Sequence, residues 1–147
     1  MNLSRRNLLK LAAAILVVSA CDKPDNSRHS FNKPDKETSM QSKFIKHKGA
    51  TLHYQIGGTE TAPFIVLLHG GFGSIADFAP LLPRLQQHYR VIAIDTRGHG
   101  RSTLGTAALT YAQAAEDARQ ILRHEGVEKY SLFGFSDGGT TAYRLGI

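Results

Sequence analysis

The amino-acid sequence predicts an α/β fold, with a mostly parallel sheet and helices on both faces. Residues 64–68 and 91–94 are continuous apolar runs, and continuous hydrophobicity is typical of parallel strands that are covered on both faces. A third apolar run, at residues 130–133, also indicates a buried strand. Stretches with helical spacing lie between these runs, and alternating strands and helices favour a mainly parallel sheet.

The predicted domain covers residues 43–147 and starts with an antiparallel hairpin. Two short runs of strand-forming residues, 44–48 and 51–56, are joined by Gly49 and Ala50. Short strand-like runs separated by a glycine-containing turn are typical of a β-hairpin. We therefore expect two antiparallel strands to precede the parallel part of the sheet.

A helical segment is expected at residues 75–87, between the first two apolar runs. Its apolar residues fall on one helical face, whereas Pro80 and Pro83 predict an early kink or two short helices. The residues expected to face inward are Phe78, Leu81, Leu82 and Leu85.

A second helix is expected at residues 111–125, before the third apolar run. Thr110 is a candidate N-cap, and Gly126 is a candidate stop signal. The residues expected to face inward are Ala114, Ala118, Ile121 and Leu122.

Residues 1–20 are expected to be a signal peptide. Arg5 and Arg6 precede an apolar stretch that is shorter than the roughly 20 apolar residues that a membrane-spanning helix needs. The arginine pair resembles a twin-arginine export signal, with the general secretory route as the alternative. Residues 18–21 (VSAC) resemble a lipobox, in which the peptide is cut before the cysteine and Cys21 receives a diacylglycerol.

Residues 21–42 are predicted to be the lipidated Cys21 followed by a flexible, polar linker. The protein is then expected to be exported and lipid-anchored to the periplasmic or outer face of a bacterial membrane. An uncleaved anchor at the N-terminus and a binding peptide hidden in the linker are the alternatives.

The composition argues against several classes of protein. The formal net charge is +6, but part of it lies in the leader and the other basic residues are scattered, which argues against a nucleic-acid partner. Cys21 is the only cysteine, so no internal disulfide can form. The seven histidines show no metal-ligand spacing, and neither a metal nor a cofactor is expected.

Residues 134–138 (GFSDG) form a G-x-S-x-G pattern between the third apolar run and a helical-looking segment at residues 139–145. A serine at a sharp strand-to-helix turn has a strained backbone and presents its hydroxyl at the top of the sheet. Small residues are needed two positions before and after it, because the turn brings those positions into close contact. Ser136 is therefore a candidate nucleophile.

Three motifs follow three predicted strands in one order: residues 69–74 (HGGFGS), 95–102 (DTRGHGRS) and 134–139 (GFSDGG). Together they resemble the α/β-hydrolase superfamily, in its single-domain esterase, lactonase and carbon–carbon hydrolase branch. The resemblance covers about residues 43–147, the N-terminal half of that fold. It implies a serine hydrolase that acts on a small ester, lactone or amide.

The resemblance also implies roles for individual residues. Ser136 would attack a carbonyl carbon and form an acyl-enzyme, while the backbone N–H groups of Gly71 and Asp137 would bind the oxyanion. Phe72 is the alternative donor, or it lines the substrate site together with Phe135. The Asp137 carboxylate is expected to cap the following helix.

The remaining histidines are expected to have structural roles. His69 would shape the oxyanion loop by hydrogen bonding, and His99 would pack within the glycine-rich turn that Asp95 and Arg97 hold together. Four more histidines are expected to be surface or hairpin residues: His47, His53, His88 and His124.

The chain departs from the family after Ser136. The family places the triad acid and then the histidine after the nucleophile, but no histidine follows Ser136 and the only later carboxylate is Asp137. We expect a domain truncated after the nucleophile elbow, inactive or crippled as this fragment, with residues 130–133 left as an uncovered apolar edge. The alternatives are a non-catalytic binding remnant and half of a two-chain hydrolase that a C-terminal chain completes.

Overall fold

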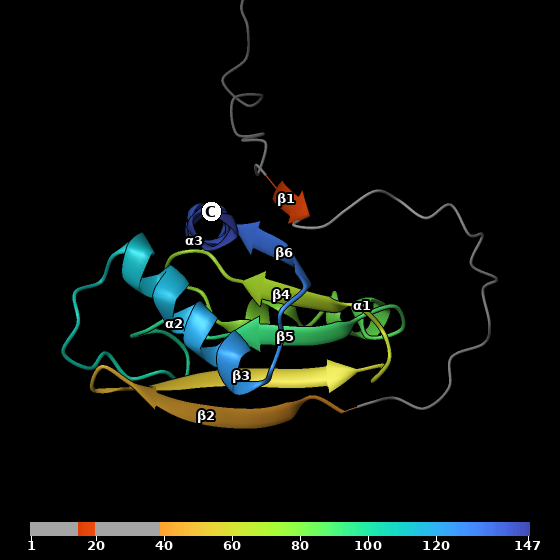
Figure 1. Ribbon diagram of the computed structural model, residues 1–147, viewed down its shortest axis with the longest axis horizontal. Helices are drawn as coiled ribbons and strands as arrows, with labels where there is room; N and C mark the ends of the chain where they lie inside the picture. The colour runs from red at the N-terminus through yellow and green to blue at the C-terminus, as the bar shows by residue number, and fades with distance from the viewer. Residues whose placement is uncertain (1–14, 20–38) are drawn as a thin grey trace, which may run out of the picture.

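The computed structural model describes residues 39–147 and the backbone of residues 15–19. A six-stranded sheet, in the order β1-β6-β4-β5-β3-β2, lies at the centre (Figure 1). The strands are β1 (Ile15–Ser19), β2 (Gln41–His47), β3 (Ala50–Gly58), β4 (Phe64–Leu68), β5 (Arg90–Ile94) and β6 (Tyr130–Phe135). The central strands β6, β4 and β5 run parallel, whereas β3, β2 and β1 pair antiparallel. The predicted α/β class is confirmed, as a mixed sheet with a parallel centre.

Helices cover both faces of this sheet. They are the 3-10 helix η2 (Ile75–Phe78) and the α-helices α1 (Leu82–Leu85), α2 (Tyr111–His124) and α3 (Asp137–Gly146). Alternate residues of β4 face opposite layers, so that Val66 and Leu68 pack with α2 and α3, while Ile65 and Leu67 pack with η2 and α1. Such two-sided burial explains why the strand sequence is continuously apolar.

The local predictions are confirmed with small differences. Lys48 and Gly49 form the two-residue hairpin turn with positive φ angles of 44° and 73°, as a type I′ turn requires. Ala50 belongs to β3, and β2 begins at Gln41, two residues before the predicted start of the domain.

The prolines do divide the first helical segment into two short helices, η2 and α1. In α2, Thr110 accepts a hydrogen bond from the Gln113 N–H as the N-cap, and Gly126 follows with a φ of 67°. In each of the two predicted helical segments, one residue expected to face inward does not. Leu81 is 41% exposed, and Ala115 rather than Ala114 is buried in α2.

Residues 130–133 were expected to form an uncovered edge, and this expectation is wrong. Strand β1 pairs antiparallel with β6, from Ile15 opposite Phe135 to Ser19 opposite Ser131. The apolar segment assigned to the leader can satisfy the unpaired N–H and C=O groups of β6 because an edge strand accepts any extended backbone. The signal peptide, the lipid on Cys21 and the linker were predicted for residues 1–42, and residues 1–14 and 20–38 lie outside the part of the chain that the structure describes.

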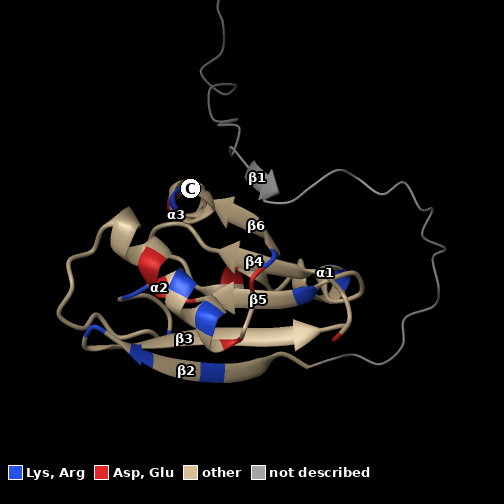
Figure 2. Cartoon of the chain, in the orientation of Figure 1, with Lys and Arg blue, Asp and Glu red and all other residues tan. Residues whose placement is uncertain are grey.

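Lysines lie along β2, and both acidic and basic residues lie along α2 (Figure 2). Lys43 of β2 pairs with Glu125, just after α2, at 3.0 Å, and Tyr54 of β3 donates a short hydrogen bond to the same carboxylate. These contacts tie the hairpin to the helix above it. Within the described residues, no helix is long and apolar enough to cross a membrane.

Candidate active site

The three sequence motifs meet at one end of the sheet. The loops that follow β4, β5 and β6 leave the carboxyl ends of three adjacent parallel strands. In open α/β sheets, ligands bind outside these ends of the strands. The candidate site is therefore built from residues 69–74, residues 95–102 and the turn at Ser136.

Ser136 occupies a strained turn between β6 and α3. Its φ of 53° and ψ of −117° lie outside the usual regions for a residue with a side chain, and the residue is exposed. A Cβ atom at Gly134 would overlap the carbonyl of Gly138, and a Cβ atom at Gly138 would overlap the carbonyl oxygen of Leu68. Glycine is therefore required at both positions of the G-x-S-x-G pattern, because the backbone there leaves no room for a side chain.

The two residues expected to donate to an oxyanion lie side by side. Asp137 is the first residue of α3, where a backbone N–H has no acceptor within the helix and the helix dipole favours an anion. A Cβ atom at Gly71 would overlap the Asp137 carboxylate, so the loop after β4 lies against the side chain of Asp137.

The two phenylalanines assigned to the substrate site are placed differently from each other. Phe135 is 47% exposed and packs on the loop after β4, where a Cβ atom at Gly70 would lie 3.0 Å from its ring. Phe72 is fully exposed and has a positive φ of 59°. Its side chain therefore projects from the loop into solvent in this structure.

The Asp137 carboxylate does not cap α3, so that expectation is wrong. The Tyr111 hydroxyl at the start of α2 donates to it at 2.8 Å, and this hydrogen bond to a carboxylate raises the pKa of Tyr111. The N-cap position is Ser136, which makes no side-chain cap. Because the strained turn directs Asp137 toward α2, the carboxylate bridges two helices.

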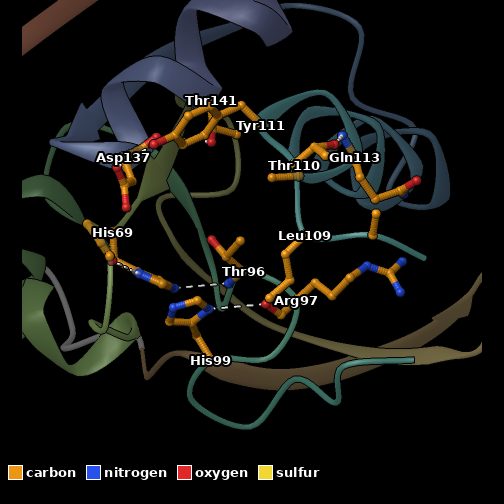
Figure 3. Close-up of a pocket in the computed structure, with 14 residues that line it drawn as sticks. His69, Thr96, Arg97, His99, Leu109, Thr110, Tyr111, Gln113, Asp137 and Thr141 are labelled. Carbon is orange, nitrogen blue, oxygen red and sulfur yellow. Dashed lines mark hydrogen bonds between the residues drawn. The ribbon is translucent and has the colours of Figure 1, made fainter. Parts of the chain in front are cut away.

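A pocket of about 480 Å³ opens beside Asp137 (Figure 3). Asp137 and Tyr111 form one wall and His69, Thr96 and His99 the opposite one, with Leu109 at the side. Gly70 and Gly71 also line it. Ser136, Phe72 and Phe135 are not among its lining residues, so the pocket adjoins the predicted nucleophile without containing it.

His69 shapes the loop after β4 by hydrogen bonding, as expected. Its Nδ1 donates to the Gly70 carbonyl at 2.7 Å, and its Nε2 accepts from the Thr96 N–H at 3.0 Å. Burial lowers the pKa of His69, with a smaller opposing effect from the Gly70 carbonyl and a further lowering by the nearby His99. Both ring nitrogens are occupied, so His69 serves to join two loops.

The glycine-rich turn after β5 is held together by buried charges. Asp95 accepts hydrogen bonds from the N–H groups of Ile75 and Arg101, and Arg97 forms a bidentate pair with Asp117 of α2 at 2.8 and 2.9 Å. His99 bonds the Arg97 carbonyl within the turn. The structural roles expected for these residues are confirmed.

Sequence reasoning missed three residues around the site. His53 was expected at the surface or in the hairpin, and it lies in the hairpin strand β3. Its burial, with 1% exposed, and its pairing with Asp95 at 2.6 Å were not predicted. Asp117 and Tyr111 were not singled out. Asp117 could have been found, because it is a charged residue on the apolar face of the predicted helix. A buried charge of this kind requires a partner.

Comparisons with known proteins agree with this architecture. A sequence profile described as the alpha/beta hydrolase fold matches residues 63–146. The chain is 39% identical over 100 residues to 3-oxoadipate enol-lactonase 1 of Acinetobacter baylyi, an alignment covering 68% of this chain and 37% of that enzyme. It is 37% identical over 110 residues to a human serine hydrolase, covering 71% of this chain and 38% of the relative.

A solved structure of a hydrolase from Pseudomonas aeruginosa superposes with a TM-score of 0.65 and 30% identity, covering 68% of this chain and 38% of that one. The chain thus spans well under half of the length of these relatives. The profile match, over residues 63–146, contains all three motifs.

Proposed function

Because the chain belongs to the alpha/beta hydrolase fold family, we propose that it is the nucleophile-bearing part of a serine hydrolase that acts on a small ester, lactone or amide. The observation that carries this proposal is the strained turn at Ser136, with a φ of 53° and glycines on both sides that tolerate no Cβ atom. Strain of this kind persists where the surrounding structure enforces it, and it clusters at active sites.

In the proposed reaction, Ser136 Oγ attacks the carbonyl carbon and forms an acyl-enzyme, which water then hydrolyses. The backbone N–H groups of Asp137 and Gly71 bind the oxyanion that develops. Removal of one such donor typically costs about 3–4 kcal/mol of transition-state stabilisation. The adjacency of Gly71 and the start of α3 supports this assignment.

A serine needs a base, and the described residues near Ser136 do not offer one. His69 has both ring nitrogens engaged. We therefore propose that the triad acid and histidine come from sequence other than residues 1–147, either further along the same polypeptide or on a second chain. The coverage of only 37–38% of the relatives supports this. The 147-residue chain alone is expected to retain little activity.

The substrate class is proposed from the pocket and the relatives. A volume of about 480 Å³ falls within the roughly 300–1,000 Å³ of small-molecule sites. One relative is an enol-lactonase, which favours an ester or lactone. A non-catalytic binding role is the second candidate, because the pocket is lined by Asp137 and Tyr111 but not by Ser136.

A fluorophosphonate probe separates these two candidates. The polypeptide as it occurs in the source cell is labelled, and the adduct is located by peptide mass spectrometry. We expect the adduct on Ser136 and none in a Ser136→Ala variant. A protein that binds small molecules in the pocket but leaves Ser136 unlabelled would contradict the hydrolase and favour the binding role.

We also propose that Cys21 carries a lipid that anchors the protein to the periplasmic or outer face of a bacterial membrane. The intact mass of the protein in the source cell's membrane fraction tests this. We expect a chain that starts at Cys21 with added diacylglycerol. An unmodified chain that starts at Met1 would contradict the signal peptide and the lipid together.

A further inference from the structure

A second serine lies at the end of a buried hydrogen-bond chain, far from Ser136 in the sheet. His53 of β3 contacts Asp95 through Nδ1 at 2.6 Å and Ser42 Oγ of β2 through Nε2 at 2.6 Å. An ionised carboxylate can only accept, so Nδ1 carries the proton and donates to Asp95. Nε2 is then the acceptor, and the Ser42 hydroxyl donates to it.

The carboxylate at the far end of this chain is held rigidly. Asp95 is 2% exposed and accepts from the Ile75 N–H at 2.8 Å and the Arg101 N–H at 2.9 Å as well as from His53. Burial raises the pKa of Asp95, but these hydrogen bonds outweigh it and the pKa lies below its usual value. Asp95 therefore stays ionised and fixes the His53 tautomer.

A guanidinium stands next to the serine oxygen. Arg101 Nη1 donates to Ser42 Oγ at 2.8 Å, and its Cζ lies 4.8 Å from the centre of the Phe44 ring. Ser42 and Phe44 are both exposed on the edge strand β2. Small molecules can therefore reach Ser42 Oγ beside a cation that favours negative charge on oxygen and an aromatic ring that offers apolar contact.

Hydroxyl, imidazole and carboxylate are thus connected in the order of a serine-protease triad, a constellation that is recognised by geometry and roles rather than by sequence position. We propose that Ser42 is a second reactive serine, which takes an acyl group from small aryl or alkyl esters with His53 as its base. Asp95 is a positioning residue, and the Arg101 guanidinium stabilises the oxyanion.

In this step Ser42 Oγ bonds to the ester carbonyl carbon while its proton moves to His53 Nε2. The tetrahedral oxyanion forms beside Arg101. Its collapse breaks the bond to the leaving alcohol, which takes the proton back from His53 Nε2, and an ester of Ser42 remains. Water attacking the same carbonyl, again with His53 as base, releases the acid and restores Ser42.

The proposed nucleophile of this site is separate from the elbow serine, although both sites use the loop of residues 95–102. Ser42 lies on β2, at the opposite end of the sheet from β6, with three strands between β2 and β6. None of Ser42, His53 and Asp95 lines the pocket beside Asp137. Because the two serines are separate, acylation of Ser42 can be measured with Ser136 replaced, and a failure at Ser42 is distinguishable from a failure at Ser136.

The experiment uses the 147-residue chain with Ser136→Ala, so that the elbow serine cannot contribute. The chain is treated with p-nitrophenyl acetate, and acetylation of each serine is followed by peptide mass spectrometry with fragmentation. We expect Ser42 to be acetylated at least about tenfold faster than Ser39, because a positioned base typically accelerates such reactions by about 10²–10⁴-fold. Ser39 is the matched reference, because it is exposed, lies three residues away in sequence and makes no hydrogen bond to a histidine or carboxylate among the described residues.

Two further variants test the mechanism. His53→Gln is expected to bring the Ser42 rate down to that of Ser39, and Arg101→Gln to lower it severalfold. A third variant, Ser39→Ala, is the control and should leave the Ser42 rate unchanged. Arg101 has an exposed side chain, so its variant keeps the test decisive if His53→Gln does not fold. Equal rates for Ser42 and Ser39 in the folded parent would overturn the proposal. So would a Ser42 rate that a folded His53→Gln leaves unchanged or, if that variant does not fold, a Ser42 rate that Arg101→Gln leaves unchanged.

Discussion

Backbone strain at the scale of single residues is concentrated beside the candidate site. Among the described non-glycine residues, Lys48, Phe72 and Ser136 have a positive φ. Lys48 is explained by its hairpin turn, whereas Phe72 and Ser136 lie in the loops after β4 and β6. Such a conformation costs a residue with a side chain on the order of 1–2 kcal/mol. Phe72 and Ser136 are therefore strained at the edge of the sheet where the parallel strands β4 and β6 end.

Gly138 and Gly139 form a matched pair for testing the close approach at the elbow. A Cβ atom at Gly138 would overlap the Leu68 and His69 carbonyl oxygens, whereas one at Gly139 would lie 3.5 Å from its nearest neighbour. We expect Gly138→Ala to lower the free energy of unfolding by about 3 kcal/mol or more. Gly139→Ala should be neutral or raise it by up to about 1 kcal/mol, since alanine favours helix. Urea unfolding measures both, and equal effects would contradict the packing argument.

His69 makes the stability of the fold depend on pH. Burial lowers its pKa from the ordinary 6.5, so the unfolded chain takes up a proton at a higher pH than the folded chain. The contribution of neutral His69 is therefore complete above about pH 6.5 and declines as the pH falls from there to the folded pKa. The Nε2 atom would have to give up its bond from Thr96 on protonation.

Two measurements check this dependence. An NMR titration of the His69 ring should show a midpoint below 6.5, and the unfolding free energy should fall as the pH drops through that window. His69→Gln should flatten the fall. A His69 midpoint at or above 6.5 would show that burial does not govern this ring.

At the scale of elements, one carboxylate connects three parts of the fold. Asp117 on the inner face of α2 accepts from Arg97 in the loop after β5 and from Gln113 one turn earlier. It also contacts His47 at the end of β2 at 2.9 Å. Arg97 is 1% exposed and donates further to the Lys48 and Leu104 carbonyls. Helix α2 thereby sets the position of the loop that lines the pocket.

Glu116 and Asp117 are adjacent in α2 and allow the stability of an exposed and a buried ion pair to be compared. Asp117→Ala would leave the buried Arg97 charge without its partner, and we expect a loss of about 3–5 kcal/mol of unfolding free energy. Glu116→Ala removes partly exposed pairs with Arg119 and Arg123 and should cost less than about 1 kcal/mol. Thermal or urea unfolding of the two variants compares them, and similar losses would mean that the buried pair has no special role.

The whole molecule keeps its parallel strands in the middle of the sheet and antiparallel strands at both edges. Strand β2 forms one edge and β1 the other. Strand β1 comes from the segment predicted to be the apolar core of a signal peptide, so export and sheet completion compete for the same residues. A chain cleaved before Cys21 lacks β1 and presents the β6 edge to other molecules.

We therefore expect the chain that starts at residue 21 to self-associate more than the 147-residue chain. The reason is that the unpaired N–H and C=O groups of β6 become available to a second molecule. Light scattering coupled to size-exclusion chromatography measures the effect. Val17→Pro in the full chain should act in the same direction, because Val17 pairs with Phe133 and proline removes a donor from the ladder. Monomers in all three cases would contradict the pairing.

Much of the fold could be predicted because its signals are local. The apolar run at residues 64–68 coincides with β4, and Thr110 caps α2 as expected. The burial of His53 could not be predicted, because alternation along β3 does not reveal that the loop after β5 covers this strand. The pairing of β1 with β6 joins residues more than a hundred positions apart, which no local pattern describes.

In the candidate site, too, the residues in the motifs could be predicted, whereas contacts between distant elements could not. Ser136, Gly71 and Asp137 were named from motifs, and the structure brings Gly71 and Asp137 together. The cap predicted for the Asp137 carboxylate was wrong. Its partner, Tyr111, lies on another element, α2, which the motif does not reveal. The exclusion of Ser136 from the pocket was likewise not foreseen, because a pocket's boundary depends on the packing of loops.

By itself, the sequence determined the order and type of the central strands and helices and the place of the strained serine, because hydrophobic periodicity and the spacing of small residues act within a few residues along the chain. Only the tertiary structure decided which polar groups meet: Asp117 with Arg97, Asp137 with Tyr111, and Ser42 with His53. The physical reason is that a buried polar group must find a partner, and the packing of distant elements alone determines which partner is within reach.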